Sequence, residues 1–203
     1  MNGTAEHLVL LVRHPQTEAN IERRYAGTSE SPYSALGEKQ ALELAHALAA
    51  WGPARVFTSP RLRTLDLAAA VAGGGSAVVL PELAEIDFGE AELMTYDEMA
   101  AAGLRVDYPG MEPLHGLQLA GETWEAFRLR IAGAAARVAT DGGRTLVIAH
   151  GGVIRALLAE WFELTPTAMF RLEIANAGHA LVAFSDDHPR LRSFGPNTLA
   201  ALG

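Results

Sequence analysis

The sequence contains no cysteine among its 203 residues. This excludes disulfides, cysteine-ligated zinc and a thiol nucleophile, and it fits a reducing compartment. Positive charge is also scarce, since Lys and Arg number 16 against 24 Asp and Glu, for a formal net charge of -8. A chain with this balance is a poor general binder of nucleic acid or of an acidic membrane. An anionic ligand would therefore need a local cluster of positive groups.

Long apolar runs and metal-ligand spacings are absent as well. No apolar stretch approaches the ~20 residues that span a bilayer, and the N-terminus lacks the basic and apolar regions of a secretory signal. No His-Glu-x-x-His or other helical metal spacing occurs. We therefore expect a cytoplasmic protein that binds no metal, nucleic acid or membrane and needs no cofactor. The sequence leaves a homodimer open.

What the chain does contain is enough apolar material for one large core. Hydrophobic residues make up 49% of the sequence, and the length suits a single α/β domain covering residues 1–203. Strand-like and helix-like runs alternate, which favours βαβ units. We predict a three-layer α/β/α sandwich with a mostly parallel sheet.

The expected elements follow from periodicity and from capping signals. Ser34 and Ser59-Pro60 are candidate helix starts, and Trp51-Gly52-Pro53 and Gly73-Gly74-Gly75 are expected stops. Strands are expected at 7–12, 55–58, 77–80 and 145–149, with a terminal hairpin formed by 180–184 and 191–194 and turning at 186–189. Helices are expected at 35–50, 60–71, 123–139 and 153–162.

The stretch from Glu82 to Gly121 lacks clear periodicity and is rich in glycine and proline. Irregular segments of this length inside a domain are usually functional. We expect it to cross the sheet edge, with a short helix near 95–102 and an inserted lid at about 89–121.

Two of the expected strands end on a histidine. The first runs into Arg13-His14 and the second into His150-Gly151. In open α/β sheets, ligands bind outside the carboxyl ends of the strands, so both histidines are expected in one crevice. Arg63, in the first turn of the next predicted helix, would join them there.

These residue types suit an oxyanion better than a metal. Arginine offers a rigid fork that matches phosphate oxygens. A neutral histidine can attack phosphorus directly if its other ring nitrogen is held by a hydrogen bond. Protonation of the leaving alcohol needs an acid, and Glu85, just after the 77–80 strand, is the best-placed carboxyl.

Six short motifs in order resemble the histidine phosphatase superfamily, in its phosphoglycerate-mutase-like branch. The family opens with Arg-His-Gly-x-Thr-x-x-Asn, and the run here is Arg13-His14-Pro15-Gln16-Thr17-Glu18-Ala19-Asn20. The remaining five are Gly37-x-x-Gln40-Ala41, Ser59-Pro60-x-x-Arg63-Thr64, Leu83-x-Glu85-x-x-x-Gly89, Gly121-Glu122-Thr123 and His150-Gly151-Gly152-Val153-Ile154-Arg155.

The resemblance implies a role for each matching residue. His14 would be the nucleophile, Arg13, Arg63 and His150 the phosphate clamp, and Glu85 the proton donor. It also implies substrate contacts from Asn20, Thr17, Gly151, Gly27 and Thr28.

The chain departs from the family pattern at two places. Pro15 stands where the family usually has glycine, and the proline removes one N–H and fixes φ. The tryptophan and glycine that often follow position 89 are missing from Glu90-Ala91-Glu92-Leu93.

The activity we expect is metal-independent hydrolysis of a small phosphorylated metabolite through a phosphohistidine. One alternative is a cofactor-dependent phosphoglycerate mutase, in which the phosphoryl group returns to the substrate; the chain is shorter than is usual for such mutases. A catalytically silent phosphate-binding or regulatory module is the alternative of another class. Turnover of p-nitrophenyl phosphate would separate the enzymes from the silent module.

Overall fold

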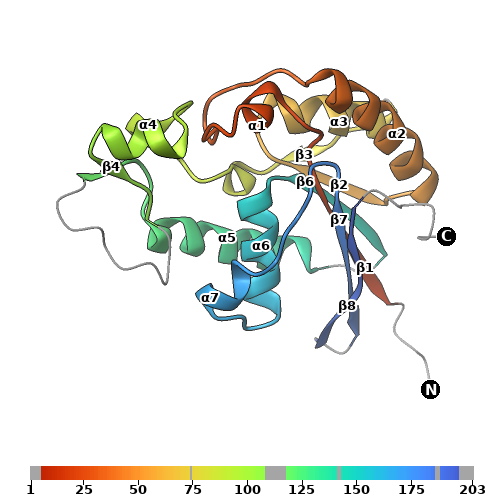
Figure 1. Ribbon diagram of the computed structural model, residues 1–203. Helices are drawn as coiled ribbons and strands as arrows, with labels where there is room; N and C mark the ends of the chain where they lie inside the picture. Colours follow the sequence, from red (N-terminus) through yellow and green to blue (C-terminus); the bar gives the residue numbers. More distant parts are fainter. Residues whose placement is uncertain (1–5, 74, 108–117, 141–142, 186–187, 197–203) are drawn as a thin grey trace.

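A six-stranded sheet forms the centre of the computed structural model, which describes residues 6–73, 75–107, 118–140, 143–185 and 188–196. The strand order is β3-β2-β6-β1-β7-β8 (Figure 1). Three pairings are parallel, β3 with β2, β2 with β6 and β6 with β1. The edge pairings β1 with β7 and β7 with β8 are antiparallel. The strands are β1 His7–Arg13, β2 Arg55–Thr58, β3 Val78–Val79, β6 Arg144–Ala149, β7 His179–Ser185 and β8 His188–Gly195.

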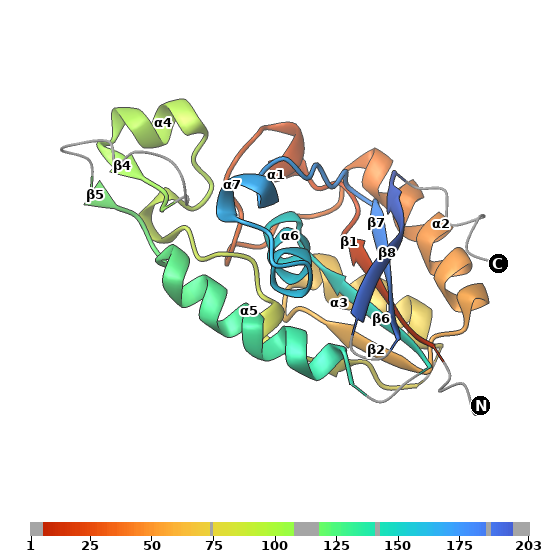
Figure 2. The ribbon, with the colours of Figure 1, turned by 90° about the horizontal axis from the view of Figure 1, so that it is seen from below.

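Helices cover both faces of this sheet (Figures 1 and 2), which confirms the predicted three-layer sandwich. Side chains alternate along β1, because successive residues of a strand point to opposite faces. Leu10 and Val12 belong to one apolar cluster and Val9 and Leu11 to the other. The first cluster includes α2 Ala35–Trp51 and α3 Leu62–Ala72, and the second includes α5 Trp124–Val138 and α6 Gly151–Trp161.

The register of β1 and β6 brings the two strand-end histidines together. Arg13 of β1 is paired with Ala149 of β6 in the parallel ladder. The next residues are His14 and His150, so both leave the sheet at the same edge. The main-chain N–H of His14 extends the ladder by donating to the carbonyl of Ala149 at 3.0 Å. Two segments far apart in sequence therefore meet where a ligand is expected.

The predicted start of α3 at Ser59-Pro60 is wrong. The helix begins at Leu62, with Arg61 as its N-cap. Ser59 instead extends β2, since its N–H donates to Ile148 at 3.1 Å, and its hydroxyl contacts His150. A serine committed to the strand end and to a histidine cannot cap the helix that follows.

Other boundaries differ by a few residues. β3 is reduced to Val78–Val79, and α6 begins at Gly151, two residues before the predicted Val153. The short helices α1 Glu18–Ile21 and α7 Pro166–Met169 were not predicted. Each is a single turn, and a single turn is too short to show a periodic apolar pattern.

The segment after β3 leaves the sheet, as expected. It contains the 3₁₀ turns η1 Pro81–Leu83 and η2 Gly89–Ala91 and the helix α4 Tyr96–Ala101. β4 Leu104–Arg105 pairs with β5 Gln118–Leu119 away from the main sheet (Figure 2). Residues 108–117 of the predicted lid, residues 186–187 of the predicted hairpin turn and Gly74 lie outside the described residues. In the described part of the chain, no helix is long and apolar enough to cross a membrane.

Candidate active site

Two histidines and two arginines gather at the carboxyl edge of the sheet. His14 follows β1, His150 follows β6, and their ring centroids are 5.2 Å apart. Arg13 is the last residue of β1, and Arg63 lies in the first turn of α3. His14, His150 and Arg63 are 4% exposed or less. The predicted cluster of positive and neutral donors is therefore present and sheltered from water.

The imidazole of His14 has a defined tautomer. Its Nδ1 lies 2.7 Å from the carbonyl oxygen of Pro15. A carbonyl only accepts, so Nδ1 of His14 carries the proton and donates it. The other nitrogen, Nε2, keeps its lone pair. This is the arrangement that a nucleophilic histidine requires.

His150 offers one nitrogen that has no protein partner. Its Nε2 lies 2.7 Å from the hydroxyl of Ser59. Its Nδ1 is buried and has no hydrogen-bond partner among the described residues. Buried polar atoms are nearly always satisfied, so such an atom at a site marks a place for a ligand.

The surroundings keep both imidazoles neutral. Burial is the largest cause, and the charges of Arg13 and Arg63 add to it, so the pKa of His14 lies well below its usual 6.5. Burial and the charge of Arg63 lower the pKa of His150 in the same direction. At neutral pH, the imidazole of His14 is therefore uncharged, with its proton on Nδ1 and a lone pair on Nε2, and it lies beside two cationic arginines.

Arg13 is held by the segment that precedes β7. One terminal N–H group donates to the carbonyl of Ile174 at 2.6 Å, and the buried Nε has no partner among the described residues. Gly151 lies against this guanidinium, since a Cβ built on it would be 3.5 Å from the Arg13 side chain. The first residue of α6 and Arg13 thus border the same space.

Arg63 is tied to the loop that follows α1. It donates to the carbonyls of Ala26, Gly27 and Ser29 at 2.8, 3.0 and 2.9 Å. Burial lowers the pKa of Arg63, and the charge of Glu85 opposes that effect. Arg63 therefore fixes the loop containing Gly27 and Thr28 next to the histidine pair.

Glu85 lies beside the cluster and faces the start of α6. Its Oε2 accepts the main-chain N–H of Gly152 at 3.0 Å. A Cβ at position 152 would lie 2.3 Å from Oε1 of Glu85, so any larger residue there would displace this carboxylate. The charge of Glu85 raises the pKa of both Arg13 and Arg63, which places its carboxylate within electrostatic reach of both.

Arg130 of α5 supports the Glu85 loop and was not singled out from the sequence. Its guanidinium donates to the carbonyls of Glu82, Ala84 and Glu85 at 2.8, 2.6 and 3.0 Å. It also forms an ion pair with Glu122 at 2.8 Å. No motif marks Arg130, because its partners are mainly carbonyls, which any residue can supply.

Asn20 and Thr17 are joined in one network. The side-chain oxygen of Asn20 accepts the Thr17 N–H at 3.1 Å, the Thr17 hydroxyl at 3.0 Å and the Asn176 amide at 2.9 Å. These donors fix the oxygen of Asn20 and leave its NH₂ group as the end that can meet an anion. Asn176, which holds it, was missed because it belongs to none of the six motifs.

The N–H groups of Gly27 and Thr28 are already used by another residue, Glu92. Its carboxylate accepts from Gly27, Thr28 and Ser29 at 3.1, 2.9 and 3.0 Å, and from Phe88 at 3.1 Å. Burial alone would raise the pKa of Glu92, but these hydrogen bonds lower it. Glu92, which no motif marks, therefore anchors the loop at 27–29 to the segment that follows β3.

Comparison with known proteins gives one family. The model of the histidine phosphatase superfamily (branch 1) matches residues 9–196. A probable phosphoglycerate mutase of Cronobacter sakazakii is 33% identical over 182 residues, covering 87% of this chain and 84% of that protein. An uncharacterized phosphatase of Bacillus subtilis is 28% identical over 197 residues, covering 94% and 95%.

Solved structures agree on the fold. A putative α-ribazole-5′-phosphate phosphatase of Escherichia coli superimposes with a TM-score of 0.80 at 24% identity, over 93% of this chain and 96% of that one. A mycobacterial glucosyl-3-phosphoglycerate phosphatase superimposes with a TM-score of 0.78 at 24% identity, over 94% and 100%. All six motifs fall within residues 9–196, the range that the family model matches.

Proposed function

The chain belongs to the histidine phosphatase superfamily, and we propose that it hydrolyses the phosphomonoester of a small phosphorylated metabolite through a phosphohistidine on His14. The observation that carries this proposal is the 2.7 Å contact between Nδ1 of His14 and the Pro15 carbonyl. This contact leaves Nε2 of His14 without a proton, in an uncharged imidazole beside two arginines. If His14 were a metal ligand, it would have no need of the Arg13 and Arg63 cations beside it.

In the first step, Nε2 of His14 attacks phosphorus and the bond to the ester oxygen breaks. Arg13 and Arg63 neutralise charge on the phosphoryl oxygens and the neutral His150 donates a hydrogen bond to them, which is the preorganised electrostatic role. The unpartnered Nε of Arg13 and Nδ1 of His150 are the atoms we assign to those contacts. The NH₂ group of Asn20 is a further donor, and Thr17 orients it.

Glu85 supplies the proton that the leaving alcohol needs. In the second step it takes a proton from water, the water oxygen attacks phosphorus, and the N–P bond to His14 breaks. Phosphate leaves, and both His14 and Glu85 return to their starting states. Gly151 and the Gly27-Thr28 loop border the phosphate, with the loop N–H groups engaged by Glu92 rather than by substrate.

The experiment is to trap the intermediate during turnover. Quenching without acid should capture phosphate on His14 that is labile in acid and stable in base. His14→Ala should turn over no p-nitrophenyl phosphate while keeping the wild-type circular dichroism. A trapped phosphate on serine or aspartate would contradict the mechanism, and a chain with no turnover of any phosphomonoester would be the silent module.

A mutase is the second candidate, because the Cronobacter relative carries that name. Both activities share the phosphohistidine and differ in its acceptor. Incubation with 3-phosphoglycerate separates them, since a mutase yields 2-phosphoglycerate and a phosphatase yields glycerate and inorganic phosphate. We propose the phosphatase as the main activity.

A further inference from the structure

A cavity of about 60 Å³ adjoins Glu85 on the side facing α5 and α7. Glu85 and Gly152 form its border with the phosphate cluster. Pockets that enclose a whole drug-sized ligand have about 300 Å³ or more, so this space would take only part of a leaving group. Its other walls are almost entirely apolar and include Ile86, Phe88, Trp124, Phe127, Met169 and Phe170.

The aromatic rings of these walls come from α5, from Phe88 just before η2 and from Phe170 just after α7. The ring centroids of Trp124 and Phe127 are 5.5 Å apart, and those of Trp124 and Phe170 are 6.3 Å apart. Phe127 and Met169 are fully buried, whereas Trp124 and Phe170 are partly exposed. Such walls favour a flat apolar group, which can contact ring edges and faces. Alcohol hydroxyls placed against these rings would lose hydration and gain no hydrogen bond from them.

Arg155 provides the cation of this pocket. Its guanidinium lies 5.6 Å from the ring centroid of Phe170, and its Nε donates to the Gly151 carbonyl at 3.0 Å. The second contact fixes the guanidinium plane at the start of α6. A guanidinium in this position stabilises aromatic π-systems next to it.

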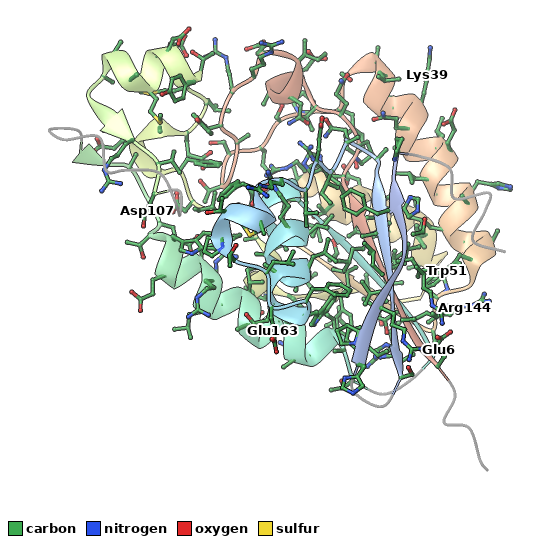
Figure 3. All side chains as sticks on the ribbon, turned by 60° about the horizontal axis from the view of Figure 1, so that its bottom comes forward. Glu6, Lys39, Trp51, Asp107, Arg144 and Glu163 are labelled. Carbon is green, nitrogen blue, oxygen red and sulfur yellow. The ribbon has the colours of Figure 1, made fainter. Side chains whose placement is uncertain are left out.

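The main chain of Trp124 is held in place by two polar contacts at the start of α5. Thr123 caps α5, and the main-chain N–H of Trp124 donates to Asp107 at 2.8 Å. Figure 3 shows Asp107 beside the first turn of α5. A wall held in this way loses little freedom on binding, which favours affinity.

We infer that this pocket selects phosphomonoesters whose alcohol carries a compact aromatic ring. The inference rests on the proposed function, because Glu85 can protonate a leaving oxygen only if the ester group lies on its side of the cluster. The alcohol would then lie against Trp124 and Phe170, with its oxygen at Glu85 and its phosphoryl group at His14. Glycerate-like and polyhydroxy alcohols would be poor substrates.

The test compares benzyl phosphate with glycerol 1-phosphate. Both release an alkyl alcohol, so both need the proton of Glu85 and differ mainly in the pocket. We expect kcat/KM to favour benzyl phosphate by roughly 10- to 100-fold. Trp124→Ala and Phe170→Ala should remove most of this preference by slowing the benzyl ester alone. Leu129→Ala, which truncates an exposed apolar residue on the same helix, should leave the preference unchanged.

A binding measurement separates this inference from the proposed function. Benzylphosphonate and methylphosphonate cannot be hydrolysed, and their dissociation constants can be compared by calorimetry in the wild type and in both variants. Tighter binding of benzylphosphonate that Trp124→Ala and Phe170→Ala abolish supports the pocket, even if no ester is turned over and the proposed function fails. Equal affinities, or a preference that both variants retain, would overturn the inference while leaving the phosphatase intact. Melting temperatures of the variants establish that each is folded.

Discussion

Nδ1 of His14 donates to the carbonyl of Pro15, the residue immediately after it. The family motif has glycine at that position, and the proline removes an N–H group there. The hydrogen bond that sets the His14 tautomer uses a carbonyl, which glycine and proline supply equally. Pro15 therefore gives no support to a catalytically silent chain.

Pro15→Gly tests this directly. We expect the rate of phosphohistidine formation to change by less than about tenfold, which corresponds to ~1.4 kcal/mol in activation free energy. Rapid-quench measurement of the first turnover gives that rate. A much larger change in either direction would show that the fixed φ of proline, rather than the carbonyl alone, sets the position of the imidazole.

Acid should destabilise the protein from about pH 6.5 downward. His14 and His150 have pKa values lowered in the folded state by burial and by nearby arginines. Below pH 6.5 the unfolded chain therefore binds protons that the folded chain excludes. The free energy of unfolding consequently decreases as the pH is lowered. Each histidine contributes at most ~1.4 kcal/mol per pH unit. Urea unfolding at a series of pH values measures the slope.

The matched variants are His14→Asn and His46→Asn. His46 is exposed on α2, so its removal should leave the slope nearly unchanged. His14→Asn should reduce the slope of unfolding free energy against pH, by an amount that corresponds to up to about one bound proton. His179, whose pKa is lowered by burial, keeps its contribution in both. A slope that His14→Asn does not alter would mean that His14 is protonated in the folded protein.

Activity should survive removal of divalent metals. Among the described residues, no group of three or more His, Asp or Glu side chains could hold a metal ion. Prolonged dialysis against a chelator should leave kcat for p-nitrophenyl phosphate unchanged. A loss that a single divalent metal restores would show that the histidines act as ligands rather than as nucleophile and clamp.

Arg130 should act as a positioning residue for Glu85. Its removal by Arg130→Met frees the carbonyls of Glu82, Ala84 and Glu85 from their shared donor. Displacement of a catalytic group by about 1 Å costs on the order of 100-fold, so alkyl phosphates should slow by roughly 10- to 100-fold. Single-turnover rates for glycerol 1-phosphate and p-nitrophenyl phosphate provide the measurement.

A double-mutant cycle distinguishes positioning from a general loss of structure. If Arg130 acts through Glu85, Arg130→Met should slow the Glu85→Gln enzyme little further. Arg130→Lys keeps the charge but not the fork, so it should restore only part of the rate. Additive losses in the cycle would assign Arg130 to overall stability instead.

The sheet and its ligand-binding edge were predictable from sequence because they depend on local signals. Apolar runs define β1 and β6, and the parallel register then brings His14 and His150 together. The predicted hairpin of β7 and β8 is confirmed for the same reason. The cytoplasmic location, the homodimer and the individual catalytic roles stay predictions.

Sequence reasoning failed where side chains bind groups that lie far away in the sequence. Glu92 was not singled out, yet it accepts from N–H groups of the loop at 27–29 across more than sixty residues of sequence. Ser59 was interpreted as a helix cap, yet it contacts His150. Both residue types are also common on solvated surfaces, so composition and spacing carry no signal for such contacts.

Glu85→Gln gives the sharpest test of the chemistry. A glycerol alkoxide needs a proton as its bond to phosphorus breaks, whereas nitrophenolate is far less basic and needs little help. General acid catalysis is typically worth about 10²- to 10⁴-fold. Glutamine keeps the size of Glu85 and can still accept the Gly152 N–H. Phosphohistidine formation should therefore slow by roughly that factor for glycerol 1-phosphate and much less for p-nitrophenyl phosphate.

Gly152→Ala provides an independent way to disturb the same carboxyl. The added Cβ would lie 2.3 Å from Oε1 of Glu85, so the side chain must move while remaining an acid. We expect the same dependence on the leaving group with a smaller loss. First-turnover rates are needed in both variants, because in the proposed mechanism Glu85 also activates water in the second step and steady-state rates would mix the two effects. If both substrates slow equally in the first step, Glu85 is not the acid, and Asp87 or Glu90 in the same loop becomes the candidate.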